Sequence, residues 1–421
     1  MVLNDKNLIT CVEFGTASVN VLHGLRDKNG LPVVLGIGKA AVEGAVRKGE
    51  IIDLKLAGEA LNRALEAADK AAGGVCERRN VYCIINGAGV AARQGEGQVV
   101  IFEEDHKIRR SHLQEAIQKA QNITLPIDQI QLVAFDAYYR IDSKHRVSDP
   151  LGMTGNRLDA YLHIFSANRT LIENMTNLLN NAGFENRIEF VVSSVASAYG
   201  ALTREEKEEG VLLVDMGAGV TDYILIHKDG ILASGILPVG TENIANDLSI
   251  GLDLPIEQCR KMLVDPVLNK KICSGTPFIE VNGAVSGTKR NIPVGSFERI
   301  IDLRLTEIFS ILRERLDPGT HNPQAAAGVV FCGGGALNPM ILKTLSSEMH
   351  MSVRRGTPLE IGGAVDHEDL TCRDTALLGL LKFAISSEDD VDNGNNLGDR
   401  LDSFLKNILQ KTKNLTEGLK I

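Results

Sequence analysis

The sequence predicts an α/β protein built from two related halves. Apolar, strand-like runs alternate with amphipathic helical segments along the 421 residues, which is the pattern of layered α/β folds. A tight glycine turn also follows a strand-like run twice, at residues 13–16 and, about 200 residues later, at 215–222. In each case an acidic residue stands just before the turn. One such turn is a weak signal, but two after similar strands indicate two related halves.

The first half is expected to begin with a hairpin formed by residues 8–14 and 19–25, followed by a strand at 33–38. Residues 54–71 predict an amphipathic helix. Its apolar positions fall on one side at helical spacing: Leu54, Ala57, Leu61, Ala64, Leu65 and Ala68. A further strand is expected at 81–85.

A smaller unit interrupts the main body after this strand. Strand-like runs are expected at 98–102, 131–141 and 161–166, and a helix at 110–121. A helix at 171–182 then leads back to the main body.

A segment of small residues at 195–201 precedes the second half. Small side chains allow close backbone approach, as a central connecting helix requires, and an ordinary alanine-rich helix is the alternative. A second hairpin over 211–225 and a strand at 231–237 follow. A helix over 242–248 then begins after Gly240, and a helix N-terminus that faces a cleft is a natural phosphate site.

Three consecutive glycines, Gly333 to Gly335, follow another apolar strand. Beside a nucleotide, such a flat backbone can pass under a base or ribose. The alternative is a plain strand-to-helix turn, in which Asn338 or Pro339 starts the next helix. Glycine turns let backbone N–H groups approach a phosphate, and a carboxylate can hold magnesium through its waters. The three motifs together favour a nucleotide cleft between the halves.

The composition is that of an ordinary globular protein, with 44% hydrophobic and 24% charged residues. The formal net charge of −9 argues against nucleic-acid binding. The seven cysteines are scattered and form no CxxC pair, which favours a reducing cytoplasm and no zinc site. The sequence begins without a signal peptide and has no run of about 18 apolar residues that could span a membrane.

The order of the motifs resembles the actin-like ATPase superfamily and, within it, the FtsA family of bacterial cell-division proteins. More specific similarity lies in five other segments: 48–54, 80–87, 149–158, 197–210 and 375–380. The resemblance implies an α/β fold of the actin-like, duplicated ribonuclease-H-like type with an FtsA-type inserted subdomain. The implied parts are a first lobe at 1–83 and 167–205, the insert at 84–166, a second lobe at 206–385 with a partner-binding subdomain at about 241–327, a linker at 386–399 and a C-terminal helix at 400–421.

The resemblance also implies a site for ATP and Mg²⁺. The phosphate turns would comprise Glu13, Gly15 and Thr16 in the first half, and Asp215, Gly217, Gly219 and Thr221 in the second. Asp215 would lie nearest the magnesium ion and hold it through water. The remaining contacts would come from Gly240 near the phosphates, from Gly333, Gly334 and Gly335 near the adenosine, and from Glu257 and Lys261 around the ribose.

Several residues depart from the superfamily pattern. Glu13 replaces the usual Asp, Ser18 stands where many members have a lysine near the phosphates, Val220 replaces a threonine, and Thr241 replaces a glycine. Residues 191–194 lack the Glu or Gln that orients the attacking water in actin-like hydrolases, so no general base is apparent there. We therefore expect ATP binding with slow or negligible hydrolysis, in which ATP acts as a structural ligand that closes the cleft.

The C-terminal region predicts a membrane tether. Residues 386–399 are acidic and rich in turn formers, which is typical of a flexible linker. An apolar stripe with basic flanks follows at helical spacing: Leu401, Phe404, Leu405, Ile408 and Leu409. This pattern suits a helix lying in an anionic membrane surface, and the FtsA resemblance favours that interpretation over a protein-docking helix or a disordered tail. Single tails would bind weakly, and filament assembly would add avidity.

The resemblance implies a scaffold on the cytoplasmic face of the plasma membrane at the division site. Its partners would be the C-terminal peptide of the tubulin-like protein FtsZ, further copies of the chain in a filament, and other division proteins on the insert. Arg304 is a plausible contact for the acidic peptide, and a solvated helix face is the alternative. Two other classes stay open: a pilus-assembly adaptor like PilM and an actin-fold sugar kinase, although no catalytic Asp or sugar loops can be placed.

Overall fold

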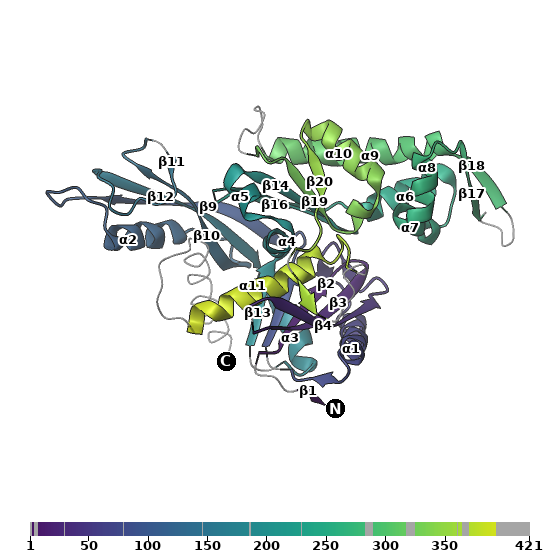
Figure 1. Cartoon of the computed structure of the whole chain (residues 1–421), viewed down its shortest axis with the longest axis horizontal. Coiled ribbons are helices and arrows are strands. Elements are labelled where there is room, and N and C mark those ends of the chain that lie inside the picture. Colours follow the sequence, from purple (N-terminus) through teal and green to yellow (C-terminus); the bar gives the residue numbers. More distant parts are fainter. Residues whose placement is uncertain are drawn as a thin grey trace.

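Three parts extend from a common centre in the computed structural model (Figure 1): a first lobe, an insert and a second lobe. The structure describes residues 2–3, 7–28, 30–78, 80–144, 146–184, 187–228, 230–282, 289–316, 325–359, 361–363 and 370–392. Strands and helices alternate as the sequence predicts, and the α/β class is confirmed.

The first lobe contains a six-stranded sheet in the order β13-β8-β2-β3-β4-β21. These strands are β2 (Ile9–Phe14), β3 (Ser18–Arg26), β4 (Pro32–Ala41), β8 (Asn80–Ile85), β13 (Arg187–Val192) and β21 (Gly362–Gly363). Helix α1 (Leu54–Ala71) packs on β3 and β4, and helix α11 (Thr375–Asp392) packs on β2, β3 and β8. Helix α3 (Arg169–Asn181) lies against α1. Short strands complete this lobe: β1 (Val2–Leu3), β5 (Val46–Arg47), β6 (Glu50–Ile51) and β7 (Val75–Cys76).

The second lobe repeats the strand plan of the first. Its sheet has the order β16-β15-β14-β19-β20, with β14 (Val211–Met216), β15 (Thr221–His227), β16 (Gly230–Leu237), β19 (Val329–Cys332) and β20 (Val353–Arg355). β2 pairs antiparallel with β3 and parallel with β8. In the same way, β14 pairs antiparallel with β15 and parallel with β19. The two halves predicted from the glycine turns therefore share one local topology.

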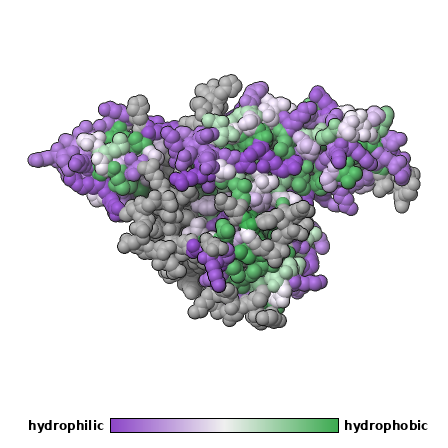
Figure 2. Space-filling model, in the orientation of Figure 1, coloured by the Kyte–Doolittle hydropathy of each residue, from purple (hydrophilic) through white to green (hydrophobic). Residues whose placement is uncertain are grey.

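The insert is a four-stranded antiparallel sheet with one helix packed on it. The sheet has the order β11-β10-β12-β9, formed by β9 (Val90–Val100), β10 (Gln129–Ile141), β11 (Arg146–Val147) and β12 (Arg157–Asn168). Helix α2 (Arg110–Gln121) has the bounds that the sequence predicts. The strand predicted at 98–102 begins earlier, because β9 pairs with β12 along its whole polar length. Figure 2 shows that the tip of the insert is hydrophilic.

The outer part of the second lobe is mainly helical. It contains α6 (Thr241–Leu252), α7 (Ile256–Val264), α8 (Pro266–Cys273), the hairpin β17 (Phe278–Asn282) and β18 (Lys289–Pro293), and the long helix α9 (Val294–Leu316). The 3₁₀ turn η1 (Gly334–Leu337) begins within the three glycines, α10 (Pro339–Met349) follows it, and the Asn338 side chain caps α10. The strand-to-helix turn that the sequence analysis gave as the alternative is thus present. One apolar cluster joins these helices to the sheet of the lobe.

Helix α4 (Ser193–Ala201) crosses the centre of the molecule and packs closely on α11. The predicted small-residue contact is confirmed, because a Cβ on Gly379 would lie 1.9 Å from the Ala196 carbonyl oxygen. Helix α5 (Arg204–Glu209) then leads into β14, and its N-terminus carries a capping box formed by Thr203 and Glu206.

The predicted start of the linker is wrong. Helix α11 continues from Thr375 to Asp392, so residues 386–392 of the expected linker are helical. The physical reason is burial on the sheet: Ser387 is fully buried, and its Oγ lies 3.3 Å from the Tyr82 hydroxyl and donates to the Ala384 carbonyl. The predicted membrane helix at 400–421 lies outside the described residues. Within the described part of the chain, no helix is both long and apolar enough to cross a bilayer.

Candidate nucleotide site

A cavity of about 1220 Å³ lies between the two lobes. It exceeds the volume of about 300–1,000 Å³ that is typical of ligand pockets, so a nucleoside triphosphate fits. Ten of the thirteen predicted contacts line it: Glu13, Gly15, Thr16, Asp215, Gly217, Gly219, Glu257, Lys261, Gly333 and Gly334. The structure thus brings together motifs from both halves and from the glycine run before α10.

The two glycine turns have the same geometry and face each other. Gly15 N–H donates to the Ser18 carbonyl over 3.0 Å, and Gly217 N–H donates to the Val220 carbonyl over 2.9 Å. A Cβ on Gly219 would lie 2.3 Å from Thr16 Oγ1, so the second turn approaches the first across the cleft. Backbone N–H groups from two such opposed turns can hold phosphate oxygens from both sides.

Three predicted residues lie behind the cavity wall. Thr221 is fully buried, and its Oγ1 donates to the Val239 carbonyl over 2.8 Å. Gly240 precedes α6, and a Cβ there would lie 2.5 Å from the Gly217 carbonyl oxygen. Gly335 packs on Met216 of β14. Their arrangement supports the second turn and the start of α6 instead of lining the cavity.

Three of the carboxylates that line the cavity come from the two glycine hairpins: Glu13, Asp215 and Asp222. Burial raises the pKa of Glu13 to about 7, and a hydrogen bond from Asn20 Nδ2 (2.8 Å) opposes this rise. Burial also raises the pKa of Asp215, whose Oδ2 accepts a hydrogen bond from Ser197 Oγ over 2.5 Å. Both pKa shifts come mainly from burial, which disfavours the charged form of a carboxyl group.

The sequence reasoning missed Asp222. This residue pairs with Asp215 across the β14–β15 hairpin, so both side chains point to the same face. Burial, followed by the charge of Asp215, raises the pKa of Asp222 well above its ordinary value. Its Oδ1 is buried and has no hydrogen-bond partner among the described residues. The signal was present, because Asp222 follows Thr221 directly in the second turn.

A divalent cation fits this set of donors. Oxygen ligands are what Mg²⁺ prefers, and it usually keeps several waters and one or two carboxylates. Asp215 and Asp222 would hold it, and the unpartnered Oδ1 of Asp222 accepts such a ligand without loss of a hydrogen bond. The bound ion would supply the positive charge that the three acids and the phosphates share.

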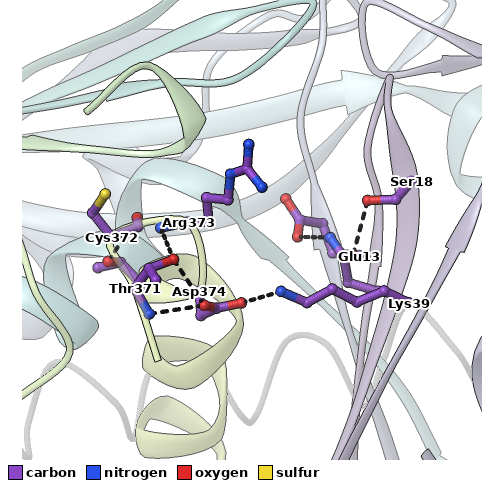
Figure 3. A network of polar contacts seen from close by, with 9 residues as sticks. Glu13, Ser18, Lys39, Thr371, Cys372, Arg373 and Asp374 are labelled. Atoms are coloured by element: carbon purple, nitrogen blue, oxygen red, sulfur yellow. Dashed lines mark hydrogen bonds and ion pairs between the residues drawn. The ribbon is translucent and has the colours of Figure 1, made fainter. Parts of the chain in front are cut away.

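Cations at the cavity were also missed from the sequence, and Figure 3 shows two of them, Lys39 and Arg373. Arg373 lies beside Gly334, which belongs to the glycine run before α10. A third, Arg260, stands on α7 between Glu257 and Lys261. Arg260 pairs with Glu257 and donates from Nε to Glu242 Oε2 over 2.8 Å, so it links α7 to α6 at the cavity wall.

Arg304 lies on α9, outside the cavity. Its Nε donates to Asp247 Oδ2 over 2.6 Å and its Nη2 to Asp247 Oδ1 over 3.0 Å, and its Nη1 donates to Glu307. The hydrogen bonds that Arg304 donates to Asp247 are the main cause that raises the pKa of the guanidinium. The partner-binding role of Arg304 stays a prediction, and an acidic peptide would have to compete with Asp247 for it.

The fold and the opposed phosphate turns define an actin-like protein. Similar solved structures include the PilM–PilN type IV pilus biogenesis complex, with a TM-score of 0.59 and 14% identity over 89% of this chain and 97% of that one. MreB5 of Spiroplasma citri bound to AMPPNP has a TM-score of 0.55 and 13% identity over 93% of this chain and 100% of that one. At these identities the likeness shows the shared fold.

The family is shown by sequence. The model "SHS2 domain inserted in FTSA" matches residues 87–166, and the model "Cell division protein FtsA" matches residues 212–372. FtsA of Borreliella burgdorferi is 28% identical over 395 residues, covering 90% of this chain and 91% of that protein. FtsA of Pseudomonas aeruginosa is 26% identical over 384 residues, covering 91% and 90%. The chain belongs to the FtsA family of cell-division proteins, and its fold is actin-like.

Proposed function

We propose that this chain binds ATP with Mg²⁺ between its lobes and acts as a membrane-tethered scaffold in cell division. The observation that carries the nucleotide part is the pair of opposed glycine turns with three hairpin carboxylates beside them, of which Asp215 and Asp222 are buried. Membership of the FtsA family supports the cell-division part. ATP is a structural ligand in this proposal, since it joins the lobes and favours the closed conformer.

Hydrolysis is proposed to be slow or absent. At the start of α4, Ser193 lines the cavity and contributes only a hydroxyl group, which a hydrogen bond to Asp222 engages. Glu13 and Asp215 also accept hydrogen bonds, from Asn20 and Ser197. The acids are therefore better suited to hold a hydrated cation than to activate a water molecule as a free base.

Nucleotide binding is tested by calorimetric titration with ATP, with and without Mg²⁺. We expect one site whose affinity falls when EDTA removes the metal, and a phosphate-release rate close to that of free ATP. Asp222→Asn should weaken the Mg²⁺ dependence, because it removes one of the proposed ligands, whereas Asp253→Asn, on the exposed end of α6, serves as the matched control. Binding of ATP with no effect of Mg²⁺ would contradict the metal site, and rapid phosphate release would contradict the scaffold role.

The tether is proposed to be the amphipathic segment 400–421, which follows the end of α11. It would place the protein on the cytoplasmic face of the plasma membrane at the division site. Co-pelleting with anionic vesicles in the presence of ATP tests this on the full chain and on a chain ending at Asp399. Pelleting of the full chain alone supports the tether. Equal pelleting of both chains would show that this segment is not the membrane anchor, and would favour a role like that of a pilus-assembly adaptor.

The partners are proposed to be the C-terminal peptide of FtsZ, other copies of the chain in filaments, and later division proteins on the insert. Arg304 on α9 is the proposed contact of the acidic peptide, in exchange for Asp247. Arg304→Ala should weaken peptide binding in fluorescence anisotropy. Arg299→Ala, on the exposed face of the same helix, is the matched control. Equal peptide affinities of the two variants would show that Arg304 does not contact the peptide.

A further inference from the structure

Lys39 lies on β4, outside both glycine turns, yet its side chain lines the nucleotide cavity. Its Nζ donates to Asp374 Oδ1 over 2.6 Å, and Figure 3 shows the pair beside Glu13. The two side chains differ in exposure: Lys39 is 47% exposed and Asp374 only 5%. The ammonium group is thus held at the cavity surface by a carboxylate that is itself buried.

Lys39 is placed next to the first phosphate turn by strand register. It pairs with Asn20 across β3 and β4, and residues directly opposite in an antiparallel pair share a face. Asn20 in turn accepts a hydrogen bond from Ser18 Oγ and donates one to Glu13. The charge of Lys39 reaches Glu13, where it lowers the pKa against the larger effect of burial. The turn itself offers no cation, because Ser18 ends it with a hydroxyl group.

The bond between Lys39 and Asp374 can be exchanged for another partner. Asp374 Oδ2 also accepts from the Thr371 N–H over 3.0 Å and from Thr371 Oγ1 over 3.2 Å, so this carboxylate keeps two donors if Lys39 leaves. Lysine carries its charge on a flexible stem with three rotatable donors. Arg260, by comparison, is engaged by two carboxylates, Glu242 and Glu257.

We propose that Lys39 is a phosphate-binding residue of this chain, which leaves Asp374 for the nucleotide phosphates when ATP enters. It supplies from β4 the cation that Ser18 does not supply from the first turn. The inference rests on the proposed ATP site. It also links nucleotide binding to α11, because Asp374 directly precedes that helix and its backbone carbonyl accepts the Leu378 N–H in the first turn.

The test compares the affinities of ATP and AMP for the full chain and for Lys39→Met, which keeps the stem and removes the charge. Since a charged hydrogen bond contributes about 1.5–3 kcal/mol, we expect ATP to bind at least about tenfold more weakly and AMP to change by less than about twofold. Lys55→Met, on the exposed face of α1 and away from the cavity, is the matched control and should alter neither affinity. Unchanged ATP affinity in Lys39→Met, or an equal loss for ATP and AMP, would overturn the proposal.

A second comparison separates phosphate binding from the effect of an unpaired Asp374. Asp374→Asn frees Lys39 and should bind ATP as tightly as the original chain or more tightly. The double variant, Lys39→Met with Asp374→Asn, removes both charges and should bind ATP as weakly as Lys39→Met. Recovery of full affinity in the double variant would show that the buried carboxylate had repelled the phosphates, and would refute a role for Lys39. If the original chain binds neither nucleotide, the proposed ATP site fails as well.

Discussion

The contact between α4 and α11 makes one substitution informative: Gly379→Ala. A Cβ on Gly379 would lie 1.9 Å from the Ala196 carbonyl oxygen and 2.6 Å from the Gly200 amide nitrogen. The contact is close in both directions, since a Cβ on Gly200 would lie 2.2 Å from the Thr375 carbonyl oxygen. All three neighbours are backbone atoms, so no side-chain rotation relieves the clash and the two helices have to move apart.

Two effects of opposite sign decide the magnitude. Alanine is favoured over glycine in a helix by about 1 kcal/mol. Overpacking in a well-packed core costs about 1–3 kcal/mol and occasionally more, and a backbone clash below 2 Å belongs at the upper end. We therefore expect Gly379→Ala to lower the free energy of unfolding by about 1–2 kcal/mol or more. Gly58→Ala on α1 is the matched control, because its Cβ would meet only Leu178 Cδ2, at 3.4 Å. The free energy of unfolding of Gly58→Ala should rise by about 0.5–1 kcal/mol.

The assay is urea unfolding of both variants, followed by circular dichroism, with thermal unfolding as a second measure. The two variants should shift the midpoint in opposite directions from the original chain. If Gly379→Ala is as stable as the original chain, the helices do not approach as described. If Gly58→Ala loses as much stability as Gly379→Ala, the effect comes from glycine replacement in general and the packing argument fails.

Two further predictions concern charge. The pKa of the Glu13 carboxyl rises from 4.5 to about 7 on folding. Its protonation therefore stabilises the folded state at low pH, and this contribution to stability is lost as the pH rises through about 7. The melting temperature of nucleotide-free Glu13→Gln, relative to the original chain, should therefore be higher at about pH 8 than at about pH 5, and a pH-independent difference would contradict the pKa. Arg354 donates to both carboxylate oxygens of Glu206, over 2.5 and 2.6 Å, and joins β20 to α5. Because Arg354 is partly exposed, Arg354→Met should lower the free energy of unfolding in urea by only about 1 kcal/mol. Arg204 forms an exposed ion pair with Glu208 within α5, so Arg204→Met is the comparison. An equal loss of stability in both variants would show that the link to β20 has no special role.

Local sequence signals predicted the elements that depend on local physics. The bounds of α1 follow from its apolar stripe and from Asp53, whose side chain accepts the Leu56 N–H over 3.0 Å and caps the helix. The two glycine turns were found because each combines a strand, an acid and a glycine within a few positions. The end of helix α11 was not predicted, because residues 386–392 are acidic and were assigned to the linker, whereas the burial of Ser387 on the sheet depends on tertiary packing.

Residues of the site that depend on distant pairing could not be found in the same way. Lys39 and Asp374 are 335 positions apart, and neither stands in a glycine motif. Arg260 stands between the two residues assigned to the ribose, but only the fold shows that Glu242 and Glu257 bind it. The alternation of side chains along a strand predicts on which face of the sheet Lys39 lies, but it does not predict that Asp374 is its partner.

The duplication explains why charge is distributed unevenly in the site. Glu13 pairs with Asn20 across the first hairpin, and Asp215 pairs with Asp222 at the equivalent place in the second. In the first half the partner is an amide that donates to the acid. In the second half it is another acid, with one oxygen left without a hydrogen-bond partner. The cation of the proposed site would therefore lie beside the second turn, whereas Lys39 already supplies positive charge near the first. In the proposed nucleotide site, this asymmetry favours the metal beside the second half and Lys39 at the phosphates beside the first.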